Sequence, residues 1–469
     1  MKNSPLRKLL PLSAVLGLAI VGLGPQGFAQ DAPVATATVQ VSPPPVPQPV
    51  PNTAIGMNTA EWDGNLYTPG VPQKLEAMGV QALRWPGGSF ADTFDWEQVP
   101  FEINMFAQLV HEIHAQAIIT VNYGSGTPAE AAAEVRYTDI THHDGFEYWE
   151  IGNEQYGDGE YQHVLWEEDY WPNKSPRGYA ENSLKFIEAM RKVDPNIKIG
   201  IDATIPGVWP SGIKPYWDRT VLPIVAKDIN FVIIHWYPEN PGQENDARLL
   251  QDPAAIPTYM KRLKAYLRQY AGSRANQIQI FVDETNNVSS DPDKQTVSLV
   301  NALFLAKDYN DWLKAGAANV SWWDLHNGIN ITTENPNLYG TANYGDYGIL
   351  SNGDPGEPPL NTPFPPYYAL CLVHAFVQPG DEYLKATSNQ QWLAAYAVKT
   401  PNANEHFMLV NTSPTLTYHA HIAAGPSLLN HSATLRYYGM DTKTIVTQHI
   451  SWTGTIAVPP YTVMEISLP

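Results

Sequence analysis

Two glutamates follow short apolar segments that are rich in β-branched and aromatic residues. Glu154 ends the segment FEYWEIGNE, and Glu284 ends the segment IQIFVDE much later in the chain. Two carboxyl groups that face each other across a bound sugar can cleave a glycosidic bond, because one protonates the departing oxygen while the other attacks the anomeric carbon or activates water. A separation of about 5 to 5.5 Å gives retention of configuration, and a wider one gives inversion.

Further polar side chains end other segments of this type, and a shared site would explain why they all do so. The alternative is that such ends are simply solvated. Aromatic residues near the ends can stack on sugar rings, with Trp323 the preferred platform, although part of the aromatic set should only pack. The candidate substrate-binding residues are Asn58, Arg84, Asn122, Asn153, His235, Tyr237, Trp323 and Trp62.

The segments that carry these residues alternate with stretches of helical periodicity. Eight strand candidates lie at 53–58, 80–86, 117–123, 146–154, 197–203, 229–237, 278–284 and 319–325. Helical candidates between them include 105–116, 179–193, 256–270 and 297–316, and a closing helix is expected near 367–377. This alternation predicts an α/β fold, a (β/α)8 TIM barrel over 53–378. A doubly wound sheet is disfavoured because no GxGxxG turn follows the first strand.

The barrel prediction brings the two glutamates together. Catalytic groups of such barrels stand at the carboxyl ends of the strands. Glu154 would end the fourth strand and Glu284 the seventh, so they would come from opposite sides of one mouth. After the barrel, residues 379–469 alternate apolar and polar positions between turns, which predicts a C-terminal antiparallel β-sandwich.

The first fifty residues predict processing and connection rather than a core. Positive charges at Lys2, Arg7 and Lys8 precede an apolar run at 9–23, and Ala29 suits a cleavage site. The run is too short to span a membrane, so 1–29 is interpreted as a signal peptide. The mature protein is expected to be secreted or periplasmic, without a membrane span. Residues 30–52 are rich in proline and are expected to form a linker.

Composition narrows the possible partners. The 469 residues include 28 basic and 47 acidic side chains, a net charge of −19, which disfavours nucleic acid. The single Cys371 excludes an internal disulfide and a cysteine-based zinc site. The sequence HEIH at 111–114 does not match the HExxH zinc motif. We therefore expect a carbohydrate substrate and neither cofactor nor metal, while the oligomeric state stays open.

Five strings resemble glycoside hydrolase clan A, in which the acid/base ends strand four and the nucleophile ends strand seven. They are LRWPGGSF, VNYGSGTP, EYWEIGNE, VIIHWY and IFVDETN. The closest likeness is to the α-L-arabinofuranosidases of family 51, and it extends over nearly all of the chain from Ile55 onward. The resemblance implies that Glu154 is the general acid/base and Glu284 the nucleophile.

The resemblance also implies roles for four neighbouring residues. Asn153 would hydrogen-bond the sugar hydroxyl next to the anomeric carbon, and Arg84 would keep Glu284 ionised. Tyr237 would donate to Glu284, while His235 would steady the acid/base side. Because an acid must hold its proton near the working pH, burial and the nearby nucleophile are expected to raise the pKa of Glu154.

The chain also departs from the family pattern. Thr285 follows the nucleophile where the family usually has Trp, and the linker is expected to run directly into the first barrel strand, without a strand that joins the sandwich. The sugar therefore stays open. One alternative is a β-1,4-glycan hydrolase of the same clan, such as a glucanase or xylanase. Others are a transglycosidase and a non-catalytic carbohydrate-binding protein on an enzyme fold.

Overall fold

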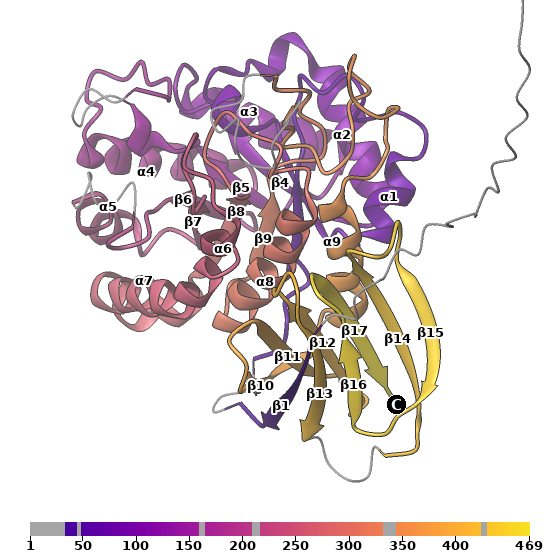
Figure 1. The fold of residues 1–469 in the computed structure, drawn as a ribbon. Coiled ribbons are helices and arrows are strands. Elements are labelled where there is room, and N and C mark those ends of the chain that lie inside the picture. The colour runs from indigo at the N-terminus through magenta and orange to yellow at the C-terminus, as the bar shows by residue number, and fades with distance from the viewer. Residues whose placement is uncertain (1–32, 45–47, 159–164, 209–215, 332–343, 424–428) are drawn as a thin grey trace, which may run out of the picture.

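The computed structural model of this chain describes residues 33–44, 48–158, 165–208, 216–331, 344–423 and 429–469 (Figure 1). The predicted signal segment, 1–29, lies outside the described residues. No helix in these ranges combines the length and the apolar character that crossing a membrane requires.

Eight parallel strands close into a barrel in which the last strand pairs with the first. Each predicted strand segment supplies one of them, so the (β/α)8 prediction is confirmed. The strands are short and almost wholly buried, as expected where helices cover the outside of a parallel sheet. They are β2 (Ile55–Asn58), β3 (Ala82–Trp85), β4 (Gln116–Val121), β5 (Tyr148–Ile151), β6 (Lys198–Asp202), β7 (Phe231–Trp236), β8 (Gln279–Thr285) and β9 (Asn319–Trp322).

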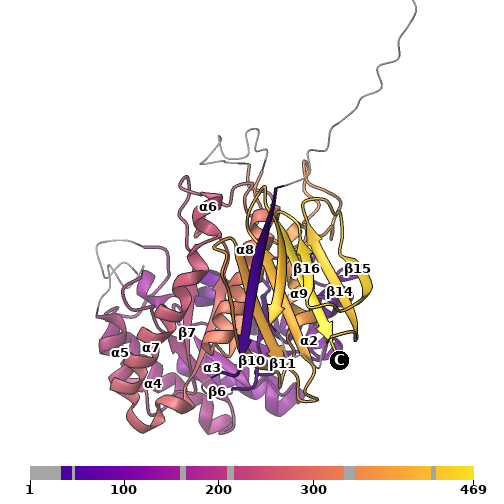
Figure 2. The same cartoon turned by 60° about the horizontal axis from the view of Figure 1, so that its bottom comes forward.

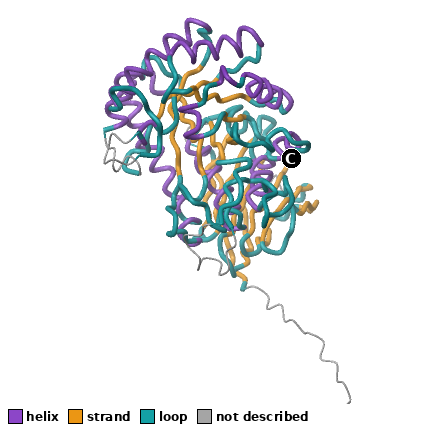
Figure 3. The backbone as a smooth tube through the Cα atoms, turned by 90° about the horizontal axis from the view of Figure 1, so that it is seen from above, coloured by secondary structure: helices purple, strands orange, loops and turns teal. Residues whose placement is uncertain are grey.

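Helices surround the strands, as the view from above shows (Figure 3). Helix α7 illustrates why: Ile256, Met260, Leu263 and Leu267 recur every three to four residues, which puts them on one buried face. The helices are α1 (Val71–Ala77), α2 (Pro100–Glu112), α3 (Pro128–Val135), α4 (Pro176–Val193), α5 (Trp217–Val225), α6 (Asp246–Leu249), α7 (Ile256–Ala271), α8 (Leu299–Ala315) and α9 (Pro365–Phe376). Short helical turns include η1 (Gly88–Thr93) and η4 (Gln155–Gly157).

The inside of the barrel has an apolar floor. Tyr148, Phe231 and Phe281 pack against one another there, with ring centroids 4.4 to 5.9 Å apart. Together with smaller apolar side chains they form a separate buried cluster. Polar groups follow towards the carboxyl ends of the strands, so the floor closes the barrel on one side and leaves the other side for a site.

The C-terminal region is a curled nine-stranded sheet that folds over its own apolar core. The predicted C-terminal β-sandwich is confirmed, and helix α9 ends just before its first C-terminal strand. Its strands are β10 (Glu382–Ser388), β11 (Leu393–Lys399), β12 (Glu405–Asn411), β13 (Thr417–Ala423), β14 (Ser432–Gly439), β15 (Val446–Ser451), β16 (Thr455–Val458) and β17 (Thr462–Leu468), together with β1 (Val34–Ser42).

Strand β1 corrects the prediction of a linker over 30–52. It pairs antiparallel with β10 and parallel with β13, deep within the sheet (Figure 2). The segment VATATVQVS alternates, and Ala37 and Val39 are buried in the sheet core. A strand before the barrel therefore does join the sandwich, and this departure from the family pattern disappears. Helices α8 and α9 pack between barrel and sheet, where apolar side chains of both regions form one continuous core.

Candidate active site

Glu154 and Glu284 lie at the same end of the barrel, at the carboxyl ends of β5 and β8. Glu154 follows β5 and has a left-handed backbone conformation, with φ 43°. Glu284 lies inside β8, next to Asp283. Neighbouring residues of a regular strand point to opposite faces. Here the pairing of β8 with β7 and with β9 shifts register at Asp283, and this bulge lets both carboxylates turn into the barrel.

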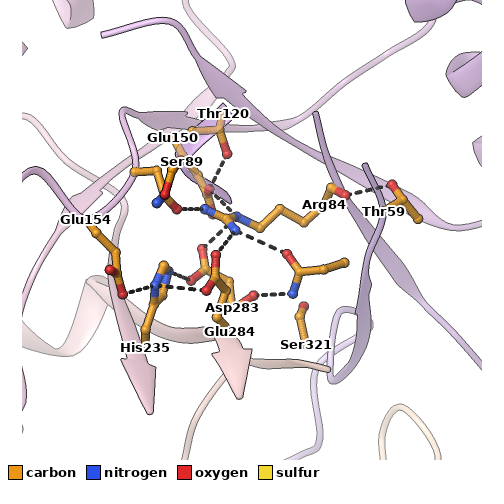
Figure 4. A network of polar contacts seen from close by, with 12 residues as sticks. Thr59, Arg84, Ser89, Thr120, Glu150, Glu154, His235, Asp283, Glu284 and Ser321 are labelled. Atoms are coloured by element: carbon orange, nitrogen blue, oxygen red, sulfur yellow. Dashed lines mark hydrogen bonds and ion pairs between the residues drawn. The ribbon is translucent and has the colours of Figure 1, made fainter. Parts of the chain in front are cut away.

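Arg84 on β3 is the centre of a buried polar network (Figure 4). Its Nη1 donates to Glu284 Oε1 at 2.7 Å, and its Nε donates to Glu150 Oε2 at 2.8 Å. Its Nη2 donates to Asn153 Oδ1 at 2.7 Å. The guanidinium thus fixes the positions of side chains from β8, from β5 and from the turn after β5, as a planar fork of donors can.

Three donors surround the carboxylate of Glu154. Trp166 Nε1 donates to Oε2 at 2.5 Å, and Tyr156 donates its hydroxyl to Oε1 at 3.1 Å. His235 Nδ1 lies 2.7 Å from the same Oε1. Burial raises the pKa of Glu154, but the hydrogen bonds from His235, Trp166 and Tyr156 outweigh it and place the pKa below its ordinary value. The expectation of a raised pKa in the free protein was therefore wrong.

His235 bridges the two sides of the site. Its Nε2 lies 2.9 Å from Asp283 Oδ1, while Nδ1 lies between Glu154 and Glu284, 3.4 Å from Glu284 Oε2. Burial disfavours a charged imidazole, but the nearby charges of Glu284 and Asp283 raise the pKa of His235 well above its ordinary value. These surroundings favour the charged imidazole, whose Nδ1 is hydrogen-bonded to Glu154 and whose Nε2 forms an ion pair with Asp283.

Glu284 accepts from Arg84 and from the hydroxyl of Tyr237, whose oxygen lies 2.9 Å from Oε2. Burial raises the pKa of Glu284, and the opposing charges of His235 and Arg84 only partly offset the increase. Arg84 therefore favours the ionised carboxylate, as expected, although the net shift is upward because burial is the larger effect.

A second carboxyl pair, Glu150 and Asp283, lies beneath the two glutamates. Burial and the charge of Asp283 raise the pKa of Glu150 well above its usual range. The pKa of Asp283 is lowered to about 2, because Arg84, Glu150 and His235 outweigh its burial. A neutral Glu150 that donates a hydrogen bond to an ionised Asp283 accounts for both pKa shifts, so the network keeps one proton beneath the site.

These side chains open into a cavity of about 430 Å³ at the barrel mouth. Its volume falls within the range of about 300 to 1,000 Å³ that small-ligand pockets occupy. The described lining residues are Gly88, Ser89, Asn153, Glu154, Trp166, Tyr237, Glu284, Ser289, Ser290, Trp323 and Tyr347. Both glutamates, one amide and four aromatic side chains therefore meet in one small space.

Glycines allow aromatic rings to close one side of the mouth. Gly87 and Gly88 have positive φ values, and a Cβ on Gly88 would lie 2.7 Å from the ring of Trp323. A Cβ on Gly87 would lie 2.9 Å from the ring of Trp62. Trp62 is 43% exposed and lies 6.3 Å from Trp323, measured between ring centroids. Trp323 therefore lines the cavity, while Trp62 lies on the outer rim.

Five predicted substrate-binding residues are not part of the described cavity lining, namely Arg84, His235, Trp62, Asn58 and Asn122. Arg84 and His235 contact the glutamates, whereas Asn58 and Asn122 have other partners. The buried amide of Asn58 donates to the backbone oxygens of Asp283 and Trp322 and accepts from Arg84. Asn122 bonds within its own turn, accepting from the backbone N–H groups of Ser125 and Gly126. These contacts make Asn58 a support for Arg84, and Asn122 a support for the loop after β4.

Sequence reasoning missed Glu150, Asp283 and Trp166. Glu150 carried a weak signal, since a glutamate in the middle of a buried strand needs a partner. Asp283 adjoins Glu284, but strand alternation would place it on the opposite face, and only the bulge reverses this. Trp166 belongs to the loop after η4, and no periodicity connects it with Glu154.

Glu154, His235 and Glu284 each place one ligand atom within 4.8 Å of the other two. Such a group of side chains can hold a metal ion, and it is the one group of this kind within the described ranges. The expectation that the protein needs no metal stays a prediction. The same distance shows that oxygens of the two glutamates come within reach of one substrate atom.

Comparison with known proteins supports the resemblance found in the sequence. No protein-family profile matches the chain. An intracellular exo-α-(1→5)-L-arabinofuranosidase of Acetivibrio thermocellus is 23% identical to this chain, over 40% of this chain and 44% of its own length. A probable α-L-arabinofuranosidase C of Aspergillus fumigatus is 23% identical over 29% of this chain and 34% of its own. The chain thus spans less than half the length of these curated relatives.

Solved structures match this chain over a much larger part of its length than the curated relatives do. The α-L-arabinofuranosidase of Thermotoga maritima, solved with arabinose, has a TM-score of 0.71 at 17% identity and covers 92% of this chain and 99% of its own. The fold is that of the family 51 arabinofuranosidases. A family 44 xyloglucanase of Paenibacillus polymyxa is also similar, with a TM-score of 0.65 at 12% identity over 92% of this chain and 99% of its own. The resemblance to clan A, and most of all to family 51, agrees with these matches.

Proposed function

We propose that this chain is a retaining glycoside hydrolase that removes α-L-arabinofuranosyl units by a two-glutamate double displacement. The observation that carries the proposal is that Glu154 and Glu284 meet in one cavity, with oxygens less than 5 Å apart. A close pair suits retention, since inverting enzymes need about 6.5 to 9.5 Å to admit a water molecule. The curated relatives and the family 51 structures favour arabinose as the sugar.

In the first step Glu284 attacks the anomeric carbon while the bond from that carbon to the leaving oxygen breaks. Glu154 gives its proton to that oxygen. In the second step water attacks the same carbon, its proton passes to Glu154, and the bond to Glu284 breaks. Arg84 and Tyr237 stabilise Glu284 as the departing carboxylate through contacts of 2.7 and 2.9 Å.

The proposal must account for the low pKa of Glu154 in the free protein, because an acid needs a proton. The donor to Glu154 that can give up a proton near neutral pH is a charged His235, whose Nδ1 lies 2.7 Å from Glu154 Oε1. A bound sugar excludes water and makes separated charges more costly, which favours transfer of that proton to Glu154. His235 then becomes neutral, and its Nε2, 2.9 Å from Asp283 Oδ1, keeps the remaining proton.

The test compares three variants on 4-nitrophenyl α-L-arabinofuranoside and on an arabino-oligosaccharide. Glu284→Ala should lower kcat on both by at least about 10⁴-fold. Glu154→Ala should no longer hydrolyse the oligosaccharide, because the leaving group of that substrate needs a proton. Azide should partly restore the turnover of the activated aryl substrate by this variant. Glu76→Ala, which removes an exposed carboxylate on α1, is the control. Retained activity in Glu284→Ala would refute the mechanism.

Stereochemistry is a separate test. Methanolysis followed by NMR should show a methyl arabinofuranoside with the configuration of the substrate. A product of opposite configuration would exclude double displacement, but it would still be consistent with an inverting hydrolase that uses the same two glutamates. Measurable turnover that Glu284→Ala abolishes would also exclude the alternative of a non-catalytic carbohydrate-binding protein.

A β-1,4-glycan hydrolase is the second candidate. The similarity to the family 44 xyloglucanase supports it, as do the exposed aromatic rings of Trp62 and Phe90, 5.6 Å apart beside the mouth. Incubation with xylan and β-1,4-glucan oligomers separates the candidates. Release of single arabinose units favours the first candidate, whereas internal cuts of the backbone favour the second.

Export from the cytoplasm is also part of the proposal and rests on the pattern of residues 1–29. Expression of the full chain in a bacterial host with a signal peptidase should give a mature protein that starts at Gln30. N-terminal sequencing of the secreted or periplasmic fraction checks the site. A cytoplasmic protein that keeps Met1 and the apolar run would contradict the signal-peptide interpretation.

A further inference from the structure

A second cavity lies at the end of the barrel opposite the two glutamates, between the barrel and the C-terminal sheet. Its volume is about 700 Å³. Gln279 and Ala318, which stand at the amino ends of β8 and β9, line it, as do residues 48–51 before β2. Helices α7 and α8 and strand β10 supply the other walls. The apolar floor of the barrel separates it from the candidate active site.

The charge of this cavity is the reverse of the charge of the whole protein. Lys264, Arg268, Lys314 and Lys385 line it, and the described lining residues include no aspartate or glutamate. The whole chain, by contrast, carries a net charge of −19. Among the ion pairs of the described residues, none involves any of these four side chains. A cationic cavity is therefore maintained within an acidic protein.

The four cations approach one another in two pairs. Lys264 and Arg268 lie four residues apart on α7, a spacing at which like charges repel. Lys314 on α8 lies near Lys385 on β10, but Asp311, which is not part of the lining, attracts Lys314 more strongly than Lys385 repels it. Burial and the neighbouring cation also lower the pKa of Lys264 and of Lys314. The repulsion between Lys264 and Arg268 therefore has no counter-charge among the described lining residues.

Other contacts hold two of the four cations, Lys264 and Lys314, in place. The half-buried Lys264 donates from Nζ to the backbone oxygen of Ala315 at 2.7 Å, close to where α8 ends. Lys314 Nζ lies 5.6 Å from the centre of the Tyr396 ring. Leu267, Ile280 and Leu313 form a buried apolar floor below them. A ligand with several negative groups would relieve the repulsion without reorganising the walls, and preorganisation favours binding.

We propose that this cavity binds a multivalent oxyanion, a ligand with two or more carboxylate or phosphate groups. Carboxylate and phosphate oxygens are the groups that guanidinium and ammonium donors bind best. The volume suits a ligand of about two sugar rings, by comparison with pockets of similar size. Because the site lies at the far end of the barrel, an acidic saccharide bound there leaves the candidate active site open.

Two probes distinguish the two sources of such a ligand. Digalacturonate presents sugar carboxylates, inorganic pyrophosphate presents phosphates, and cellobiose is the neutral control. Melting temperature and calorimetric titration are measured on the full-length protein at constant ionic strength. At least one anion should raise the melting temperature, and more so at low salt. The anion that responds identifies the source, and cellobiose should have no effect at this site.

Charge-matched double variants localise the binding. Arg268→Gln with Lys385→Gln removes two exposed cations of the cavity and should weaken anion binding by about tenfold or more. Lys261→Gln with Lys443→Gln removes two exposed cations outside the lining and should leave the affinity unchanged. Failure of both anions to bind would overturn the proposal, and so would equal weakening in the two double variants. Because binding is measured directly, the result does not depend on whether the chain hydrolyses glycosides.

Discussion

The barrel mouth and the C-terminal sheet both contain buried side chains, but charged groups are frequent among those of the mouth and rare among those of the sheet. At the mouth, Arg84 and Asp283 are almost fully buried and belong to one network with Glu150, His235 and Glu284. The core of the sheet consists of apolar side chains, and its buried amide, Asn411, donates to three backbone oxygens. Among the described strands of the sheet, the one buried charged side chain is Glu465, and it is paired with Arg436.

The difference indicates which region is built for chemistry. Burial of an ion pair costs desolvation that its attraction often fails to repay, and an apolar replacement can be more stable. The core of the sheet is built almost entirely from apolar side chains, which avoids this desolvation cost. The barrel mouth keeps five ionised or polar side chains around one guanidinium, and that arrangement is useful where a reaction needs preorganised charge. The expected effects of substitution should therefore separate the two regions.

The largest effect is expected from Arg84→Met. The substitution leaves Glu150, Asp283 and Glu284 buried without their guanidinium, and it should lower the free energy of unfolding by about 3 to 5 kcal/mol. Glu284 would take up a proton, so kcat should fall by about 10³-fold or more. Urea unfolding and kinetics on the aryl arabinofuranoside check both results.

A second variant guards against simple misfolding. Arg84→Lys keeps a positive charge but cannot donate to Glu150, Asn153 and Glu284 at once. It should fold with a smaller loss of stability and still lose most of its activity. Near-normal kcat in a folded Arg84→Lys would show that the network supports only the fold.

The next effect concerns the pH dependence of stability, and it compares Asp202 at the barrel mouth with Glu465 in the sheet. Burial raises the pKa of Asp202 to about 8 and that of Glu465 to about 6. Each group ionises in the unfolded chain above about pH 4 but stays protonated in the folded protein up to its raised pKa. The folded state then holds more protons, so stability falls as pH rises through that window.

The two windows differ, and this makes the test selective. Of these two groups, only Asp202 still contributes between pH 6.5 and 8, with a slope of up to about 1.4 kcal/mol per pH unit. Asp202→Asn should flatten the fall in unfolding free energy over that range, and Glu465→Gln should not. Unfolding by urea at several pH values measures both slopes. Equal slopes in wild type and Asp202→Asn would contradict the expected titration of Asp202.

Much of the fold could be predicted from the sequence, because the barrel strands are continuous apolar runs with polar ends. Runs such as INFVIIHWY contain enough local information to mark β7 and the residues at its end. The same reasoning placed Glu154 and Glu284 at one end of the barrel, which the structure shows.

The parts that could not be predicted depend on partners far away in the chain. Strand β1 is mostly Ala, Thr and Val, and only pairing with β10 and β13 makes it part of a core. Asp283 faces inward because of a bulge that has no sequence signal. The low pKa of Glu154 depends on Trp166 and His235, which come from a loop and from another strand. Burial alone predicts the opposite shift.

A smaller effect is expected from Trp166→Phe, which keeps a ring in the cavity but removes the donor to Glu154 Oε2. Loss of a hydrogen bond to a charged group should lower kcat/KM by about tenfold. Because the indole N–H lowers the pKa of Glu154, its loss should move the alkaline limb of the pH profile to higher pH. A lower rate with an unmoved limb would indicate a packing role instead.

The smallest effect is expected from Arg436→Met in the sheet, which provides the counterpart of Arg84→Met. Arg436 Nη1 lies 2.8 Å from Glu465 Oε2, and the arginine side chain is 34% exposed. Ser467 still donates to Glu465, and the carboxyl can take up a proton, so the loss of stability should be about 1 kcal/mol. That loss should shrink below about pH 6, where Glu465 is protonated in the folded protein. Because the pair has no contact with the barrel mouth, kcat/KM should stay at the wild-type value, and a marked fall in activity would show that the two regions are coupled.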